Sequence, residues 1–250
     1  MGIHDSPNPE VKTLRGLHLY HFFLSNCSQR VRFGLEEKGL AWTSHHVNLP
    51  AGEHATAEYQ SINPKGVVPT LVHDGVVVIE SNDILAYLDE HFPEPPLRPA
   101  DAGARRAMQE LVDAASDIQP AIKVLSHELL FRRFRKVEPE HVAFFEANHN
   151  DPELVAFLRD YAAEDDAWKA RVEKGHADMR AALVRLEDAL SRRPWLSGED
   201  FGLADISWLV NANRLAQAGY DLEPYPKLRA WLGKVAARPA CDRALSWRPE

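Results

Sequence analysis

The sequence has very little cysteine. Cys27 and Cys241 are the only two, and they stand near opposite ends of the 250 residues. A disulfide-stapled fold needs several pairs, normally in a shorter secreted chain. The scarcity of cysteine therefore argues against a disulfide framework and predicts a reducing, cytoplasmic setting.

Long apolar runs and an excess of positive charge are also missing. No stretch approaches the roughly 18 apolar residues of a membrane-spanning helix, and residues 1–12 lack the apolar segment of a signal peptide. The 37 acidic side chains outnumber the 29 basic ones, which gives a net charge of −8. Because such a surface repels phosphate backbones, we expect neither a nucleic-acid partner nor a membrane partner.

Glycine and proline occur in ordinary amounts, 13 and 17 residues, which excludes collagen-like and low-complexity chains. With 45% hydrophobic residues, the chain can bury a sizeable core, and its length lies between one large domain and two small ones. The first six residues match the bare myristoylation pattern. Asp5, Pro7 and Pro9 favour instead a disordered leader over residues 1–16.

Strands and helices alternate in the first half of the chain. Apolar and aromatic patterning predicts strands over 17–23, 42–49, 68–72 and 76–79, and helices over 27–38 and 81–92. The helix between the first two strands makes them parallel, whereas the turn at Asp74-Gly75 makes the last two an antiparallel hairpin. We expect Ser81 to cap the second helix and Pro93 to end it.

The densest proline run, over residues 93–99, marks a predicted domain boundary. Helical patterns dominate the chain beyond it. The predicted organisation is a first domain over 17–93, a linker over 94–100 and an all-helical domain over 101–250.

The first predicted strand runs directly into a helix at Ser25-Asn26-Cys27-Ser28. Unpaired N–H groups and the positive dipole end of a helix N-terminus stabilise an anion there by up to about 2 kcal/mol. A thiolate is such an anion, so Ser25 and Cys27 are candidates for sulfur chemistry. On the alternative interpretation, Ser25 or Asn26 only caps the helix, and Cys27 is a small buried residue.

Two further pairs stand where a ligand could be held. A cis bond between Val68 and Pro69, at the start of a strand, would turn the Val68 N–H and C=O outward to pair with a peptide backbone. At the junction of Glu80 and Ser81, the serine and the helix N–H groups suit a carboxylate, and the glutamate suits an ammonium. An α-amino acid carries both of those charges on one carbon.

Together these residues resemble the glutathione transferases. The resemblance covers about residues 17–248, and its most specific parts are Asn63 to Thr70, Glu80-Ser81 with the apolar residues that follow, and residues 194–206. It implies an α/β thioredoxin-like N-terminal domain plus an all-α C-terminal helical domain, with glutathione as co-substrate.

The resemblance also implies where glutathione lies. Its γ-glutamyl end would bind Glu80 and Ser81, and its cysteinyl backbone would pair with the residue before the cis proline. The loops before that strand offer two partners for the glycyl carboxylate. The glutathione-binding residues expected in this way are His54, Lys65, Val68, Pro69, Glu80 and Ser81.

The segment from Leu24 to Arg32 is similar to the zeta class and to reductive dehalogenases of chlorinated hydroquinones. In those relatives a serine stabilises the glutathione thiolate and a cysteine attacks a glutathionylated intermediate, roles that would fall on Ser25 and Cys27. Residues 48–54 and the long middle insert also resemble bacterial β-aryl etherases. The implied function is sulfur transfer to a small, aromatic electrophile by conjugation, dehalogenation or ether cleavage. The alternative is a non-catalytic binding module with the same fold.

A homodimer is a further implication of the resemblance, with Arg105, Arg106 and Met108 facing the partner. No metal site is expected, because His127-Glu128 lacks the second histidine that a zinc-binding helix requires.

Two other groups of residues remain open to two interpretations. The basic run over 132–136 could attract an anionic second substrate or be a solvated helix end. Phe157, Tyr161 and Trp168 could line an acceptor pocket or belong to the core.

Overall fold

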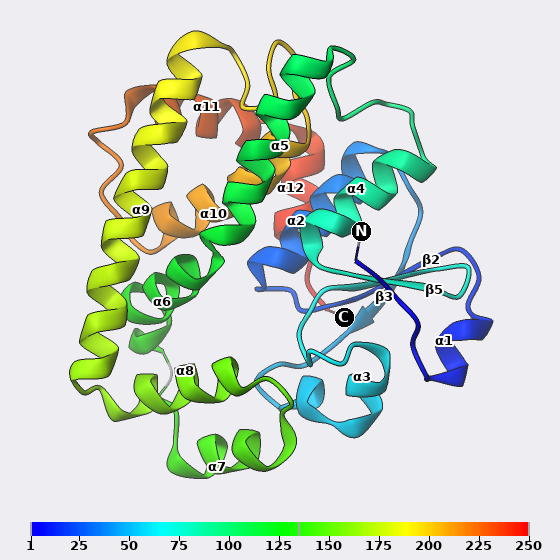
Figure 1. Cartoon of the computed structure of the whole chain (residues 1–250), viewed down its shortest axis with the longest axis vertical. Coiled ribbons are helices and arrows are strands. Elements are labelled where there is room, and N and C mark those ends of the chain that lie inside the picture. Colours follow the sequence, from blue (N-terminus) through cyan, green and yellow to red (C-terminus); the bar gives the residue numbers. More distant parts are fainter. Residues whose placement is uncertain (1, 135, 250) are drawn as a thin grey trace.

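The structure is a computed structural model that describes residues 2–134 and 136–249. A sheet with helices on both faces forms the first part of the chain, and helices alone form the second, lying beside it (Figure 1). The predicted combination of a thioredoxin-like domain with an all-helical domain is confirmed.

The sheet has five strands in the order β1-β5-β4-β2-β3. β2 (Leu17–His21) pairs in parallel with β3 (Thr43–His46), and β4 (Thr70–His73) pairs antiparallel with β5 (Val76–Ile79), as predicted. The hairpin turn at Asp74 and Gly75 has φ of 49° and 86°, the left-handed region that Asp-Gly turns favour. β4 also pairs antiparallel with β2, which places the hairpin at the centre of the sheet.

The expected disordered leader is wrong. β1 (Ile3–His4) adds to the sheet beside β5, and α1 (Pro9–Thr13) follows, capped by the Asn8 side chain. Val11 of α1 is fully buried against the sheet. A two-residue strand and a five-residue helix are too short to show a sequence period, which explains the error.

Alternation along the strands gives the sheet two apolar faces. Leu19, Leu71 and Val78 point to the face that is covered by α2 (Asn26–Glu37) and α4 (Ser81–His91). Their neighbours Val72 and Val77 point to the other face. There they contact α1 and α3 (Ala57–Ile62), which follows the short 3-10 helix η1 (Glu53–Ala55).

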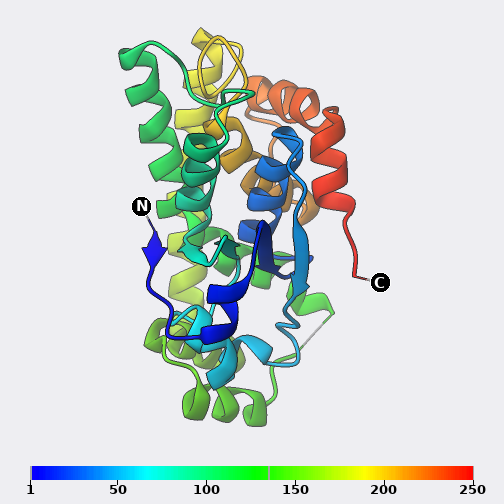
Figure 2. The ribbon, with the colours of Figure 1, turned by 90° about the vertical axis from the view of Figure 1, so that its right-hand side faces the viewer.

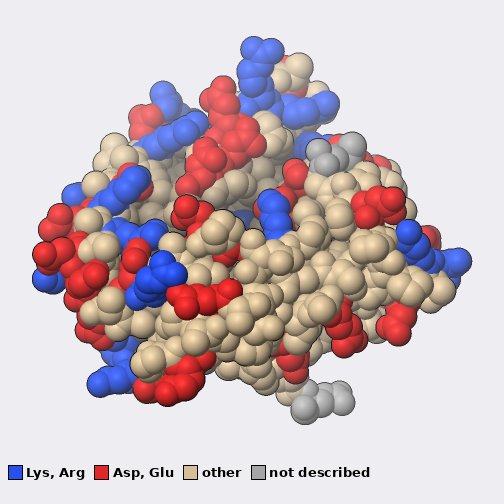
Figure 3. All heavy atoms as spheres, turned by 60° about the horizontal axis from the view of Figure 1, so that its bottom comes forward, with Lys and Arg blue, Asp and Glu red and all other residues tan. Residues whose placement is uncertain are grey.

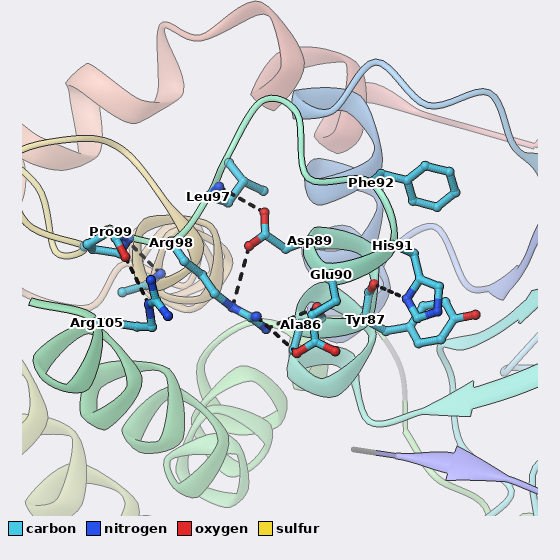
Figure 4. Close-up of polar contacts among 12 residues, drawn as sticks. Ala86, Tyr87, Asp89, Glu90, His91, Phe92, Leu97, Arg98, Pro99 and Arg105 are labelled. Atoms are coloured by element: carbon cyan, nitrogen blue, oxygen red, sulfur yellow. Dashed lines mark hydrogen bonds and ion pairs between the residues drawn. The ribbon is translucent and has the colours of Figure 1, made fainter. Parts of the chain in front are cut away.

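The linker between the two parts is held by polar contacts to α4 (Figure 4). The Asp89 carboxylate accepts a hydrogen bond from the Leu97 N–H over 3.0 Å, pairs with Arg98 over 3.6 Å and pairs with Lys38 over 2.8 Å. Lys38 also donates to the carbonyl of Phe92, at the end of α4, and to that of Pro95, in the linker. The proline run is therefore a fixed connection in this structure.

The helical part consists of eight α-helices among the described residues. They are α5 (Ala102–Asp117), α6 (Gln119–Leu129), α7 (Pro139–Asn148), α8 (Pro152–Ala163), α9 (Asp166–Arg192), α10 (Leu203–Gln217), α11 (Pro226–Ala236) and α12 (Pro239–Ser246), with the 3-10 helix η2 (Phe131–Arg133) after α6. None of the helices in residues 2–134 and 136–249 has the length and apolar character that crossing a membrane requires.

The buried start of α10 organises the core of this part. Asp205 accepts hydrogen bonds from the backbone N–H groups of Leu196, Ser197 and Gly202, and from the indole of Trp231 over 2.7 Å. Burial raises the pKa of Asp205, while hydrogen bonds from Trp231, Leu196 and Gly202 act in the opposite direction. The carboxylate thereby fixes a loop, a helix start and a neighbouring helix to one another.

α7 and α8 extend beneath the sheet-containing part and meet the α3 side of it (Figures 1 and 2). The Gln60 amide donates to the Asn148 carbonyl over 2.7 Å, and the His149 ring lies 2.9 Å from the Gly66 carbonyl. Phe145 of α7 packs with Ala55. On the face where these helices come forward, acidic and basic side chains are interspersed around a broad uncharged area (Figure 3).

Candidate functional site

Ser25 is the N-cap of α2. Its backbone is extended, and its hydroxyl oxygen accepts a hydrogen bond from the Ser28 N–H over 3.3 Å. No residue that the structure describes accepts the proton of the Ser25 hydroxyl. The capping role and a chemical role are therefore compatible, because capping uses the oxygen and leaves the proton for a thiolate.

Cys27 lies two residues after Ser25, as the second residue of α2, and is half-buried. Its sulfur is 3.5 Å from the Gln119 side-chain oxygen of α6 and 4.0 Å from a guanidinium nitrogen of Arg30. The cysteine thus lies where the first domain faces the helical one, and the alternative of a fully buried small residue does not hold.

Arg30 was not singled out by the sequence analysis, yet it is the central polar group of the site. It is 1% exposed and donates to the Ser81 hydroxyl over 2.7 Å, to the Ser207 carbonyl over 3.2 Å and to the Asn211 side chain over 3.3 Å. Burial lowers the pKa of Arg30, and neighbouring Cys27 acts in the opposite direction. The sequence carried no local signal for this role, because the partners of Arg30 other than Cys27 lie 51 or more residues away.

Ser81 is the first residue of α4 and not its cap, because Glu80 occupies the N-cap position without a side-chain capping bond. The Ser81 oxygen accepts from Arg30, and among the described residues none accepts from its hydroxyl. The Ser81 proton and the first N–H groups of α4 are thus available to a carboxylate.

Glu80 has a φ of 65°, in the left-handed region that a glutamate rarely adopts. Its carboxylate is 2.5 Å from the ammonium group of Lys65, and both side chains are about half exposed. The structure therefore brings Lys65 to the predicted amino-acid end of the site and pairs it with Glu80.

The Val68-Pro69 peptide bond is cis, as predicted. Asn63 fixes the loop before it by donating to the Val67 carbonyl over 2.9 Å and to the Thr70 hydroxyl over 3.0 Å. The backbone N–H and C=O of Val68 itself are not bonded to any of the residues described. They are free to pair with a peptide-like ligand.

His54 is 7% exposed and lies under the helical insert. Its ring centroid is 5.1 Å from that of Phe145 and 5.8 Å from that of His149. Burial lowers the pKa of His54 to about 4, helped by nearby His149, His141 and Lys123. The ring is therefore neutral at pH 7, and its buried Nδ1 atom has no hydrogen-bond partner among the described residues.

Three other expectations concern residues outside this group. Met108 is fully buried in the helical core and cannot face a partner subunit, because its side chain is on the inner face of α5. Phe157, Tyr161 and Trp168 are at most 4% exposed and pack together as core. In the basic run, Arg132 pairs with Glu128 and Glu164, and Arg135 lies outside the described residues.

Comparisons with known proteins match both parts of the chain. Residues 19–96 match the family model of the glutathione S-transferase N-terminal domain, and residues 166–234 match that of the C-terminal domain. Glutathione S-transferase 1 from Dianthus caryophyllus is 44% identical over 235 residues, which span 91% of this chain and 92% of that protein. Maleylacetoacetate isomerase from Pseudomonas aeruginosa is 30% identical over 233 residues, which span 91% and 95%.

A solved structure is similar over nearly the same length. The crystal structure of the beta-etherase LigF from Sphingobium sp. strain SYK-6 superposes with a TM-score of 0.82 at 28% sequence identity. The superposition covers 92% of this chain and 98% of LigF.

Proposed function

Because the chain belongs to the glutathione S-transferase family, we propose that the N-termini of α2 and α4 together bind glutathione and activate its thiol. The protein is an enzyme, and glutathione is its co-substrate. The observation that carries the proposal is that Ser25 and Ser81 stand at these two helix starts, each with a hydroxyl proton that no described residue accepts, and that Arg30 of α2 donates to Ser81.

Glutathione spans the two helix starts in this proposal. Ser81 and the α4 N–H groups bind the γ-glutamyl carboxylate, and Glu80 binds the ammonium of the same amino-acid group. The Val68 backbone, before cis Pro69, pairs with the cysteinyl backbone. Lys65, which pairs with Glu80, would hold the Glu80 carboxylate in place at this end of the ligand.

His54 is the remaining proposed glutathione contact, at the glycyl carboxylate. Its unpaired Nδ1 atom, buried beneath Phe145, supports a polar partner that arrives with the ligand. These contacts lie in a proposed glutathione-binding domain over residues 17–93, joined by a linker over 94–100 to a helical domain over 101–250.

The protein promotes sulfur transfer by stabilising the glutathione thiolate and by holding it beside the second substrate. The Ser25 hydroxyl and the α2 N-terminus stabilise the thiolate, which attacks an electrophilic carbon of a small aromatic substrate. The carbon–sulfur bond forms as the bond to a halide or aryl oxide breaks, and the leaving group departs with the electron pair. Similarity to a beta-etherase over nearly the whole fold supports ether cleavage in particular.

We also propose a homodimer in the cytoplasm. Arg105 and Arg106 are exposed on α5 and are available to a partner subunit, whereas Met108 is not. Sedimentation at micromolar protein concentration measures this directly, and a species of 28.2 kDa would contradict it.

An ultraviolet titration of the thiol of bound glutathione tests the proposed activation. We expect the thiolate to form at a lower pH in the complex than in free glutathione, because Ser25 and the helix dipole favour the charged form. A thiol that titrates as in free solution would contradict the proposal and favour a binding module. A panel of aryl halides, β-aryl ethers and maleyl compounds then separates conjugation, ether cleavage and isomerisation.

A further inference from the structure

Lys123 lies on α6, one helical turn after Gln119. Side chains four residues apart share a helix face, and Gln119 is the residue whose side chain contacts Cys27. Lys123 lowers the pKa of His54, and Cys27 raises the pKa of Lys123. A lysine of the helical domain therefore stands within electrostatic reach of two candidate site residues of the first domain.

The ammonium group of Lys123 has one close partner, an aromatic ring. Its nitrogen is 4.2 Å from the ring centroid of Phe157, on α8. An ammonium carries three N–H donors, and a ring face satisfies them only weakly. Within residues 2–134 and 136–249, no oxygen accepts a hydrogen bond from this ammonium and no carboxylate pairs with it.

Burial lowers the pKa of Lys123 to about 8. The charges that face it come from three helices or their ends, α8, α2 and α9. Asp151 and Glu153, beside and in α8, raise the pKa, as does Cys27 of α2, whereas Arg171 of α9 lowers it. Lys123 is therefore a cation at pH 7 that is only partly exposed and has no carboxylate partner among the described residues.

We propose that Lys123 is a specificity-determining residue, whose ammonium pairs with a negative charge on the second substrate. The enzyme would then prefer electrophiles that carry a carboxylate or a similarly anionic group. This inference rests on the proposed function, because the electrophile must approach the glutathione thiol near Cys27. An anionic ligand would supply the counter-ion that the described residues do not.

Two glutathione thioethers that differ by one charge test the proposal without requiring turnover. The first carries the ring of a nitrobenzoic acid, and the second carries the matching nitrobenzamide. Calorimetry on the wild-type protein should give about tenfold tighter binding of the acid, the scale of one charge-assisted hydrogen bond. Lys123→Met should reduce the ratio of the two affinities to near one, and Lys123→Arg should restore most of it.

Lys169→Met is the matched control, since Lys169 is an exposed lysine of α9 that pairs with Asp166. It should keep the wild-type ratio. Equal binding of acid and amide by the wild-type protein would overturn the inference. An affinity ratio that Lys123→Met leaves at the wild-type value would overturn it as well.

S-methylglutathione separates this inference from the proposed function. If the wild-type protein binds S-methylglutathione but does not distinguish acid from amide, only the role of Lys123 fails. If S-methylglutathione itself does not bind, the proposed glutathione site fails and the inference with it.

The pH dependence of the affinity ratio provides a second readout. The preference for the acid should be present at about pH 6.5 and should disappear as the pH rises through about 8, because Lys123 loses its proton there. Both thioethers carry the same glutathione groups, so titration of the glutathione part of the ligand affects both alike. A ratio that does not change between these pH values would contradict the assignment to Lys123.

Discussion

Arg30 donates a hydrogen bond of 2.7 Å to the hydroxyl of Ser81, 51 residues further along the chain. Because Arg30 is on α2 and Ser81 opens α4, this bond joins the two helix N-termini that the proposed ligand spans. The guanidinium can only donate, so it occupies the Ser81 oxygen and leaves the hydroxyl proton for an incoming carboxylate. One buried side chain thus sets both the spacing of the two ends of the site and the direction of a hydroxyl.

Ser81→Ala should weaken glutathione binding. The substitution removes a hydroxyl that binds the γ-glutamyl carboxylate and leaves one donor of buried Arg30 unpaired, which should cost roughly 1.5–3 kcal/mol, about tenfold or more in affinity. Calorimetry with glutathione measures the change. Ser191→Ala is the control, because the Ser191 hydroxyl bonds only locally to the Asp188 carbonyl on exposed α9. Unchanged affinity in Ser81→Ala would mean that the γ-glutamyl group binds elsewhere.

Ser25→Ala should raise the pKa of the bound glutathione thiol and slow conjugation on the order of 100-fold, the scale of losing one preorganised donor. The same change removes the N-cap of α2 and should lower the free energy of unfolding by about 1 kcal/mol. Ser25→Asp separates the two effects, since aspartate caps a helix and cannot donate to a thiolate at neutral pH. Thiol titration and urea denaturation measure them.

If Ser25→Asp kept the wild-type rate and thiol pKa, the hydroxyl would have no part in activation. If Ser25→Ala lost activity only in proportion to its lost stability, the serine would be a cap and nothing more.

The sequence was most informative where the signal was local. The turn at Asp74-Gly75 and the helix starts at Ser25 and Ser81 depend on neighbouring residues, and all three were located from the sequence, although Ser81 is the first residue of α4 and not its cap. Residue types at these points constrain φ, hydrogen bonding or capping directly. The cis bond before Pro69 was expected from the family resemblance.

The contacts between the domains could not be predicted in the same way. Arg30 bonds to Ser207 and Asn211, about 180 residues away, and no periodic pattern indicates such pairs. The pairing of Lys65 with Glu80 was missed for the same reason, because it depends on how two loops meet. Met108 was misplaced because the inward face of α5 is fixed by the helices packed against it.

Cys27→Ser should distinguish simple conjugation from reductive chemistry. If Ser25 alone activates glutathione, the variant should conjugate an aryl halide at close to the wild-type rate. If the reaction is reductive, the Cys27 thiolate attacks the sulfur of a glutathionyl thioether, the carbon–sulfur bond breaks, and the carbon takes up a proton to give the reduced product. A second glutathione then reduces the mixed disulfide between Cys27 and the first, which leaves as glutathione disulfide. The variant should then stop after one equivalent and accumulate the conjugate.

A mass spectrum of the product mixture provides the measurement. Cys241→Ser is the control, because Cys241 lies on α12, is buried in the helical core and was not placed in the proposed site. Release of reduced product over many turnovers by Cys27→Ser would remove Cys27 from the catalytic residues.

His54 should make the folded protein sensitive to acid. Its pKa is lowered from 6.5 to about 4 in the folded state, chiefly by burial. Between these two pH values the unfolded chain binds a proton that the folded one does not, so the free energy of unfolding falls as the pH falls from about 6.5 to about 4. The full effect is about 3 kcal/mol, and no further loss from this group is expected below about pH 4.

His54→Gln removes the titrating group from this position. Urea denaturation at a series of pH values should therefore show a shallower slope between about pH 4 and pH 6.5 in the variant than in the wild type. Part of the slope should persist, because His21 is also buried and its pKa is lowered to about 3. His176→Gln, at a partly exposed histidine of α9, should keep the wild-type slope. If His54→Gln also kept the wild-type slope, His54 would have to be accessible to protons in the folded state. The packing of Phe145 and His149 over it would then not hold in solution.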